Sequence, residues 1–122
     1  MAQEFCKKVE IPDPIKESLN KIGGLPGIEA RLPSNERIKR LSKIFHAMSD
    51  PLRVQILFIL DNQPLCVCLI KELTAAQDSK LSYHLSVLKD AGLISGKQEA
   101  NWIIYEISDL GKLILASVSS IH

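Results

Sequence analysis

The chain has 122 residues, of which 46% are hydrophobic and 24% are charged, an ordinary balance for a single soluble domain with a modest core. Its formal net charge of +1 indicates no polyanionic partner by bulk charge alone. The sequence contains no apolar segment as long as a membrane span or the core of a secretory signal, so we expect a cytoplasmic protein without a membrane partner. Its three cysteines are an odd number, which argues against a framework of disulfide bonds.

The first 33 residues are expected to form an arm that precedes the domain. Prolines and glycines divide residues 1–33 into short pieces, and only residues 14–22 place apolar side chains at helical spacing. The domain proper is therefore expected over residues 34–122.

Two helices are predicted at the start of this domain. Ser34 is a suitable N-cap for a first helix over residues 36–48, whose apolar residues recur every three or four positions. Asp50 caps a second helix that has Pro51 at its first position. Residues 52–60 of that helix are apolar nearly all round, so we expect it to be central and buried.

Two further helices, joined by a tight turn, come next. A third helix covers about residues 67–75, and a polar turn leads to a fourth helix over residues 79–91, with Asp78 or Ser79 as its cap. Gly92 suits the position just past a helix end, where a left-handed backbone is common.

The end of the chain has the pattern of a hairpin followed by one more helix. Residues 93–107 contain two short apolar stretches around a polar tip, which predicts a β-hairpin. An amphipathic helix over residues 109–120 follows, capped by Ser108 or Asp109. The predicted fold class is therefore mainly α with a small β-hairpin, in the element order of a winged helix-turn-helix.

The fourth helix is predicted to have one buried and one functional face. Leu81, Leu85 and Leu88 share one side and should point inward. The other side is rich in hydroxyl groups and small side chains, which can approach phosphates and base edges closely. The residues that we expect to contact DNA are Ser79, Lys80, Ser82, Tyr83, His84, Ser86 and Lys89 of this helix and Lys97 at the hairpin tip. The alternative is a merely solvated face, because helix-turn-helix patterns also occur in proteins that bind no DNA.

The hairpin also carries two large aromatic side chains. We expect Trp102 and Tyr105 to pack on the body of the domain, which is the usual fate of large aromatics near a sheet.

The stretch LCVCL places Cys66 and Cys68 one residue apart, and three roles are open for this pair. The thiols could be small buried apolar groups, an oxidisable pair, or ligands of a thiophilic ion. In an ideal helix, positions i and i+2 lie about 200° apart. Both thiols can therefore converge on one ion only if Cys66 precedes the third helix or the first turn of that helix is distorted.

Three segments together resemble the ArsR/SmtB family of metal-responsive repressors. They are AMSDPLRVQILFIL (47–60), LSYHLSVLKDAGLI (81–94) and NWIIYEI (101–107), and the resemblance covers about residues 36–118. It implies a homodimer that binds double-stranded operator DNA and releases it on binding an inducer. It also implies that helix 79–91 is the recognition helix and that the dimer surface comes from helices 36–48 and 109–120.

The same resemblance implies a role for the cysteines. Cys66 and Cys68 stand where arsenic- and cadmium-sensing members carry a cysteine pair, with Leu69 where those members have Asp. In some members the partner chain's N-terminal arm adds a third thiolate, and Cys6 lies on such an arm here. Three sulfurs suit arsenite or antimonite and are one short of the four ligands usual for structural zinc. A single arm cysteine makes cadmium and lead less favoured.

The family's other common metal site, on the last helix, is not expected. Residues 108–122 offer only Asp109 and His122, which are too far apart to share one face of a short helix.

The sequence therefore predicts a dimeric repressor whose operator is released when a thiophilic metalloid or metal binds Cys66, Cys68 and Cys6. Arsenite and antimonite are the favoured inducers, and no obligatory cofactor is expected. One alternative is a repressor that senses oxidants or reactive sulfur through the same cysteines. Another is a winged-helix module that binds a protein partner. An enzyme is not expected, since the sequence has no nucleophile–base set and no phosphate-binding loop.

Overall fold

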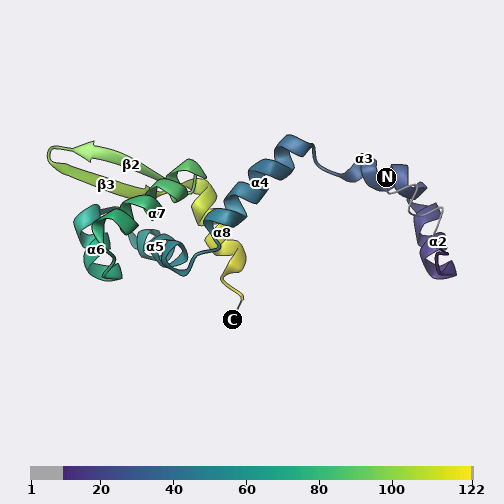
Figure 1. The fold of residues 1–122 in the computed structure, drawn as a ribbon, viewed down its shortest axis with the longest axis horizontal. Coiled ribbons are helices and arrows are strands. Elements are labelled where there is room, and N and C mark those ends of the chain that lie inside the picture. The colour runs from purple at the N-terminus through teal and green to yellow at the C-terminus, as the bar shows by residue number, and fades with distance from the viewer. Residues whose placement is uncertain (1–9, 122) are drawn as a thin grey trace. The chain divides into compact units, whose positions relative to one another are not determined.

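The computed structural model describes residues 10–121, and its contacts divide the chain into two compact units, residues 1–38 and residues 39–122. Figure 1 shows the order of the elements along the chain. The domain boundary expected between residues 33 and 34 stays a prediction. Within the described residues no helix is both long enough and apolar enough to cross a membrane.

The first unit contains two short helices, α2 (Asp13–Lys21) and α3 (Gly24–Arg31). The helix predicted over residues 14–22 is confirmed, whereas α3 was not predicted. Its Pro26 is compatible with a helix because it lies in the first turn, where the N–H that proline lacks would have no helical acceptor.

Two capped helices follow, as the sequence predicts. In α4 (Asn35–Ala47), the Ser34 hydroxyl accepts a hydrogen bond from the N–H of Arg37 at 3.2 Å. In α5 (Pro51–Asn62), the Asp50 carboxylate accepts from the N–H groups of the second and third helical residues at 2.8 and 3.4 Å. These bonds satisfy donors that have no acceptor inside the helix, which fixes where each helix begins.

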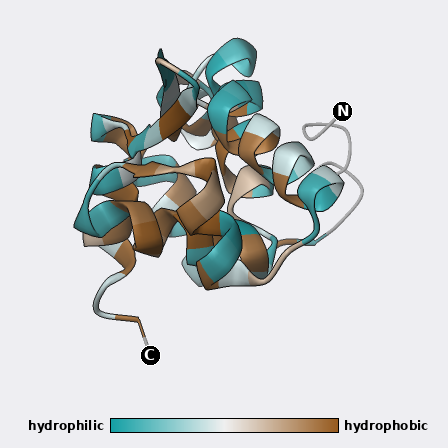
Figure 2. Cartoon of the chain, turned by 90° about the vertical axis from the view of Figure 1, so that its left-hand side faces the viewer, coloured by the Kyte–Doolittle hydropathy of each residue, from teal (hydrophilic) through white to brown (hydrophobic). Residues whose placement is uncertain are grey.

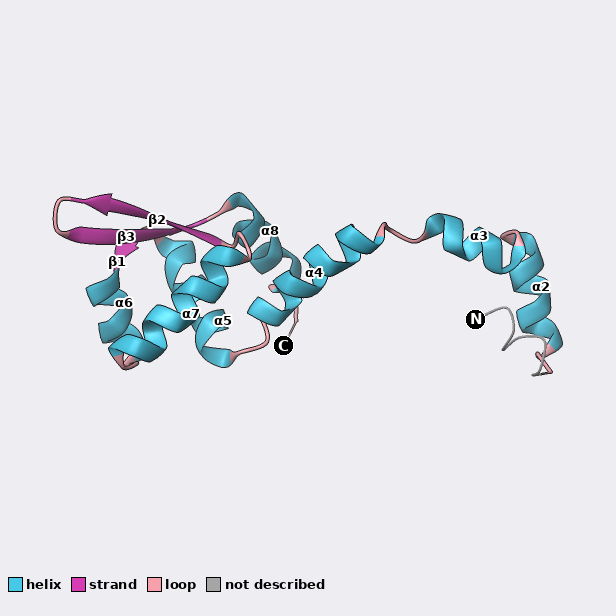
Figure 3. Cartoon of the chain, turned by 45° about the horizontal axis from the view of Figure 1, so that its top comes forward, coloured by secondary structure: helices cyan, strands magenta, loops and turns pink. Residues whose placement is uncertain are grey.

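The sheet has three strands, one more than the predicted hairpin. Strands β2 (Ile94–Glu99) and β3 (Trp102–Ile107) form the hairpin, and the two-residue strand β1 (Leu65–Cys66) pairs antiparallel with β3. A strand of two residues has no periodicity that a sequence pattern could reveal. The hairpin projects beyond the helices as a wing (Figures 1 and 3).

The remaining helices, α6 (Val67–Thr74), α7 (Asp78–Asp90) and α8 (Asp109–Val118), lie within one residue or two of the predicted ranges. The helices carry both hydrophobic and hydrophilic turns in Figure 2, as expected for amphipathic elements around a core. The buried apolar residues of this core are Ile44, Ala47, Ile56, Leu57, Leu60, Ile70, Leu81, Leu85, Leu88, Leu93, Ile94, Ile107 and Leu115.

Tight hydrogen bonding joins α7 to the wing and the wing to α8. Gly92 has φ +78, and the N–H groups of Gly92 and Leu93 donate to the carbonyls of Lys89 and Leu88, which is a Schellman motif. Ser108 then caps α8 by accepting from the N–H of Gly111 at 3.0 Å. The predicted end of α7 and the Ser108 cap are both confirmed.

Candidate DNA interface and thiol site

The turn between α6 and α7 is held by backbone geometry rather than by the predicted side-chain caps. Neither Asp78 nor Ser79 caps α7, because its N-cap is Gln77 and no side chain bonds there. The Asp78 carboxylate instead pairs with Lys71 of α6 at 2.6 Å. Both side chains are well exposed, so this pair contributes little to stability. Ala75 turns the chain with a left-handed backbone, φ 56.

The outer face of α7 is formed as predicted. Leu81, Leu85 and Leu88 are buried on its inner side. The exposed residues of the helix include Ser79, Lys80, Ser82, Tyr83, Ser86 and Lys89. Lys97 is exposed on the wing, where it forms a 3.5 Å ion pair with Glu99. The structure thus presents hydroxyl groups and cations together, and their contact with DNA stays a prediction.

His84 differs from its expected place at the DNA-facing edge. Its side chain is only 6% exposed, and its Nδ1 lies 2.9 Å from Nη1 of Arg53, so the ring faces the interior of the protein. The sequence held a signal for this contact that was missed. Arg53 is the one charged residue between Leu52 and Leu60, and a charge in such a buried apolar helix needs a partner inside the protein.

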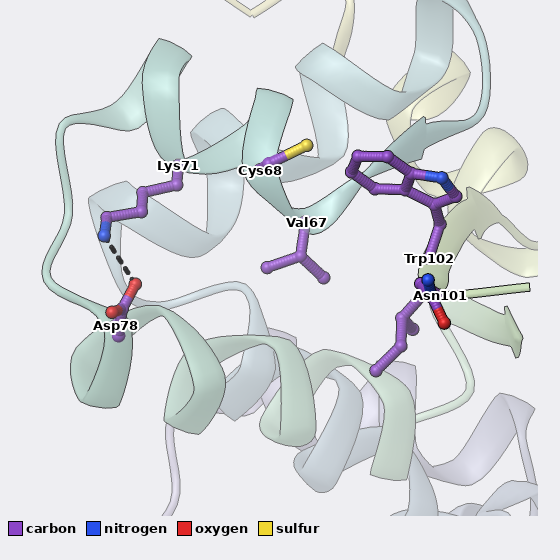
Figure 4. Close-up of a pocket in the computed structure, with 7 residues that line it drawn as sticks. Val67, Cys68, Lys71, Asp78, Asn101 and Trp102 are labelled. Atoms are coloured by element: carbon purple, nitrogen blue, oxygen red, sulfur yellow. Dashed lines mark ion pairs between the residues drawn. The ribbon is translucent and has the colours of Figure 1, made fainter.

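The aromatic residues of the wing have different environments. Tyr105 is partly buried and packs against Gly96 of the neighbouring strand, where an added Cβ would lie 3.0 Å from its ring. Trp102 does not pack on the body as expected, since its side chain is 55% exposed. It stands instead beside the Cys68 sulfur (Figure 4).

Cys66 and Cys68 come together because they belong to different elements. Cys66 ends β1 and is the N-cap of α6 with an extended backbone, φ −73 and ψ 158, whereas Cys68 lies in the first helical turn. Their Sγ atoms are 2.8 Å apart. The geometric condition set by the sequence, that Cys66 must precede the helix, is therefore fulfilled. Cys68 is exposed and Cys66 half-buried, so neither thiol is a fully buried core group.

The two thiols share one hydrogen bond and therefore differ in acidity. The hydrogen bond from Cys68, helped by nearby backbone N–H groups, lowers the pKa of the Cys66 thiol. The same interaction raises the pKa of Cys68, because its proton is held by the neighbouring sulfur. The pair can thus hold one proton between two sulfurs, with the negative charge on Cys66.

Two shallow hollows adjoin the thiol pair. One, of about 440 Å³, lies between α6, the start of α7 and the wing and is lined by Val67, Cys68, Lys71, Asp78, Asn101, Trp102 and Ile103 (Figure 4). The other, of about 490 Å³, is lined by Gln63, Pro64, Leu65, Cys66, Cys68, Leu69, Trp102 and Ile104. Both are open, so a small ligand can reach the sulfurs from solvent.

Cys6, the third predicted ligand, lies outside the described residues. Within residues 10–121, no cluster of three or more His, Cys, Asp or Glu residues is arranged to hold a metal ion. The described part of the chain therefore supplies two convergent sulfurs, and a third ligand from Cys6 stays a prediction.

Comparison with known proteins identifies relatives among transcriptional regulators. The family described as bacterial regulatory protein, arsR family, matches residues 50–95. An uncharacterized HTH-type transcriptional regulator of Methanocaldococcus jannaschii is 40% identical over 76 residues, which cover 61% of this chain and 84% of the relative. The arsenical resistance operon repressor of Bacillus subtilis is 34% identical over 76 residues, covering 62% and 72%.

Solved structures agree with the fold. NolR from Sinorhizobium fredii superposes with a TM-score of 0.66 at 29% identity, covering 75% of this chain and 96% of that chain. Together with the relatives, this match confirms the predicted winged helix-turn-helix and the prediction of a regulator rather than an enzyme.

Proposed function

The chain belongs to the ArsR family of transcriptional repressors, and from this premise we propose that it is a homodimeric repressor that releases its operator when a thiophilic metalloid or metal binds its cysteines. Arsenite and antimonite are the favoured inducers. The observation that carries the proposal is the 2.8 Å approach of the Cys66 and Cys68 sulfurs on an open surface. We place the protein in the cytoplasm, where such thiols stay reduced.

Double-stranded operator DNA is the partner that the outer face of α7 suits. Hydroxyl groups of this face, those of Ser79, Ser82 and Tyr83 among them, can reach base edges and phosphates. We expect the exposed Lys80 and Lys89 to contact the DNA backbone, and Lys97 to do so from the wing.

The nature of the thiol pair supports a soft inducer. Two sulfurs favour thiophilic ions over hard cations such as Mg²⁺ or Ca²⁺. The lowered pKa of Cys66 means that one thiolate forms more readily, and thiolates are the form that binds metals. The Bacillus subtilis relative, by its name a repressor of an arsenical resistance operon, is 34% identical over 76 residues, and on this basis we test arsenite first.

Ligand binding at this pair can act on both DNA-contacting elements. Cys68 belongs to α6, which leads into α7 through three residues, Ala75–Gln77. Cys66 belongs to β1, where it pairs with Ile104 of β3 and thereby with the wing. An ion that draws the two sulfurs to new positions therefore strains the helix-turn-helix and the wing together. Inducer and operator binding are then linked, each weakening the other.

Titration of operator binding tests the proposal. The reduced protein is bound to a fluorescent duplex from its own upstream region, and anisotropy is followed during separate additions of arsenite, antimonite, cadmium and zinc. We expect release by arsenite or antimonite below the concentrations at which zinc acts. Cys66→Ser and Cys68→Ser should keep operator affinity and lose release. Release that persists in both variants would sink the inducer site.

Cys6→Ser defines the third ligand in the same assay. We propose that Cys6 from the partner's arm completes a three-sulfur site, so this variant should need more arsenite for release. Unchanged release in Cys6→Ser would leave Cys66 and Cys68 as the whole site.

A redox-sensing repressor is the second candidate, and the short Sγ–Sγ distance favours it as well. Sulfurs at 2.8 Å, one of them with a lowered pKa, are placed for oxidation by a peroxide or a disulfide reagent. Release of DNA by diamide in the absence of any metal, reversed by dithiothreitol, would favour this candidate. Release by arsenite alone would remove it.

A further inference from the structure

The guanidinium of Arg53 is buried, although it forms no ion pair with a carboxylate among the described residues. Its side chain is 4% exposed. The ion pairs of the described residues are Lys71–Asp78 and Lys97–Glu99, and neither includes Arg53. Against desolvation, backbone hydrogen bonds and the charge of Arg53 lower the pKa of the nearby Asp50 carboxylate, but Asp50 and Arg53 form no ion pair. A buried guanidinium without an ion pair is costly unless other groups accept its hydrogen bonds.

The C-terminal end of α4 supplies such acceptors. Arg53 Nε donates to the carbonyl of Ala47 at 2.8 Å, and Nη2 donates to the carbonyl of His46 at 3.2 Å. These carbonyls belong to the last turn of α4, which carries the negative end of the helix dipole. The carbonyl of His46 also accepts from the N–H of Ser49 at 3.1 Å, so Arg53 adds a further donor at this helix end. Arg53 therefore joins the start of α5 to the end of α4.

The third contact of the guanidinium reaches the recognition helix. Arg53 Nη1 lies 2.9 Å from Nδ1 of His84. Because a guanidinium can only donate, Nδ1 must accept, so the His84 ring is neutral with its proton on Nε2. Among the described residues this is the one side-chain hydrogen bond that links α7 to α5.

The hydrogen bond between Arg53 and His84 restricts the rotation of α7 about its axis more tightly than apolar packing does. Leucine side chains bury the inner face of α7, but apolar burial is non-directional and therefore limits the rotation of a helix about its axis less sharply than a hydrogen bond does. A hydrogen bond to a fixed fork of N–H groups tolerates little rotation. His84 also precedes Leu85 and follows Tyr83, whose ring it meets edge-on at a centroid distance of 5.2 Å. Its position thus sets the direction of the exposed Tyr83.

We propose that Arg53 and His84 are positioning residues for DNA recognition, holding the rotation of α7 so that its hydroxyl-rich face meets the operator in register. Neither side chain touches the DNA itself. The proposal rests on operator binding by this family and is independent of the inducer, so failure of arsenite to release DNA would leave it standing.

Comparison of specific and non-specific binding in the full-length protein tests the proposal. Dissociation constants are measured for the operator and for a scrambled duplex, at a temperature where circular dichroism shows every variant to be folded. His84→Leu removes the acceptor, and His84→Asn returns an acceptor oxygen close to the position of Nδ1. We expect His84→Leu to weaken operator binding by about tenfold and His84→Asn by less than about threefold.

Binding to the scrambled duplex should change little in either variant, because phosphate contacts supply it. Partial unfolding of a variant would weaken its binding to both duplexes equally. The ratio of the two dissociation constants therefore separates an effect on the position of α7 from an effect on stability. Equal loss on both duplexes, equal loss in His84→Asn and His84→Leu, or no loss in His84→Leu would each overturn the proposal.

A double variant guards against misfolding of the single ones. His84→Leu leaves a buried guanidinium short of an acceptor, whereas Arg53→Leu combined with His84→Leu removes both polar partners. This double variant should be at least as stable to urea as His84→Leu alone. It should still show the loss of operator affinity, and operator binding at the wild-type level in the folded double variant would also overturn the proposal.

Discussion

Cys66 and Cys68 are two cysteines one residue apart, yet the pKa values of their thiols differ because the Cys68 thiol donates a hydrogen bond to the Cys66 sulfur across 2.8 Å. The pKa of Cys66 is lowered and that of Cys68 is raised by this bond. Near neutral pH, therefore, more of the Cys66 thiol is present as the reactive thiolate. This inequality is a property of two residues in one local geometry, and no larger part of the protein is needed to produce it.

The inequality predicts which thiol reacts first. In a Cys6→Ser background, iodoacetamide at pH 7 should alkylate Cys66 faster than Cys68, as read by peptide mass spectrometry. In Cys68→Ala the donor is lost, so the midpoint of the pH–rate profile of Cys66 should move to higher pH. Cys68→Ser keeps a hydroxyl donor and should fall between the two. A profile that does not move in Cys68→Ala would refute the shared hydrogen bond.

Ala75 is a second residue whose environment predicts a measurable effect. Its φ of 56 is left-handed, which costs an alanine about 1–2 kcal/mol and a glycine almost nothing. Glycine at position 75 would relieve this cost, but part of the gain in stability is offset because glycine makes the unfolded chain more flexible. Ala75→Gly should therefore raise the free energy of unfolding by roughly 0.5–1 kcal/mol.

Urea denaturation with a matched control checks this value. Ala76 is the next residue in the same turn, and its φ is not positive. Ala76→Gly should lower the free energy of unfolding by at least about 0.5–1 kcal/mol, because glycine makes the unfolded chain more flexible and also removes a methyl group that packs against the core. Loss of stability in both variants would show that the strain at Ala75 is not relieved by glycine.

At the scale of the elements, the sequence predicted what is periodic or capped. The helix α5 was found because of its Asp50 cap and α7 because of its leucine spacing, which are local signals, and the wing was found because two apolar strands flank a polar tip. The strand β1 was missed because its two residues are defined only by pairing with β3. The interior place of His84 was missed for the same reason, since its partner Arg53 is 31 positions away in the sequence.

The thiol site illustrates the same limit. The sequence showed that the two thiols can meet only if Cys66 precedes the helix. It could not show that Cys66 does so, because the extended backbone of Cys66 depends on its pairing with Ile104 of β3. Trp102 as a wall of the adjoining hollow was also missed, since its neighbour Cys68 is brought to it by the fold.

The outer face of α7 predicts how DNA affinity depends on salt. Each phosphate contact that is lost should reduce the slope of log affinity against log salt concentration by about 0.9. Lys80→Ala and Lys89→Ala should therefore lower both affinity and slope, as measured by anisotropy between low and physiological salt. Lys16→Ala on α2 is the control, because this exposed lysine belongs neither to the proposed DNA interface nor to the helices of the predicted dimer surface. Equal slopes in all three variants would remove α7 from the interface.

At the scale of the whole molecule, two helices leave large apolar side chains exposed. Phe45 of α4 is 70% exposed and Leu113 of α8 is 64% exposed. Single exposed apolar residues are ordinary, but these two lie on the helices from which the dimer surface is predicted. We expect them to be covered in the homodimer, where large apolar residues contribute most of the affinity.

Charge introduced at this surface should separate the protomers. Phe45→Asp and Leu113→Asp bury a carboxylate if the dimer forms, so sedimentation at micromolar concentration should show a shift toward monomer. Phe58→Asp is the control, since Phe58 is 48% exposed but lies on α5, outside the predicted surface. Operator affinity should fall with the dimer fraction, because one protomer can hold only one half-site. If Phe45→Asp and Leu113→Asp remain dimers, the dimer interface does not include these residues. If only Phe58→Asp dissociates the dimer, the interface lies on α5.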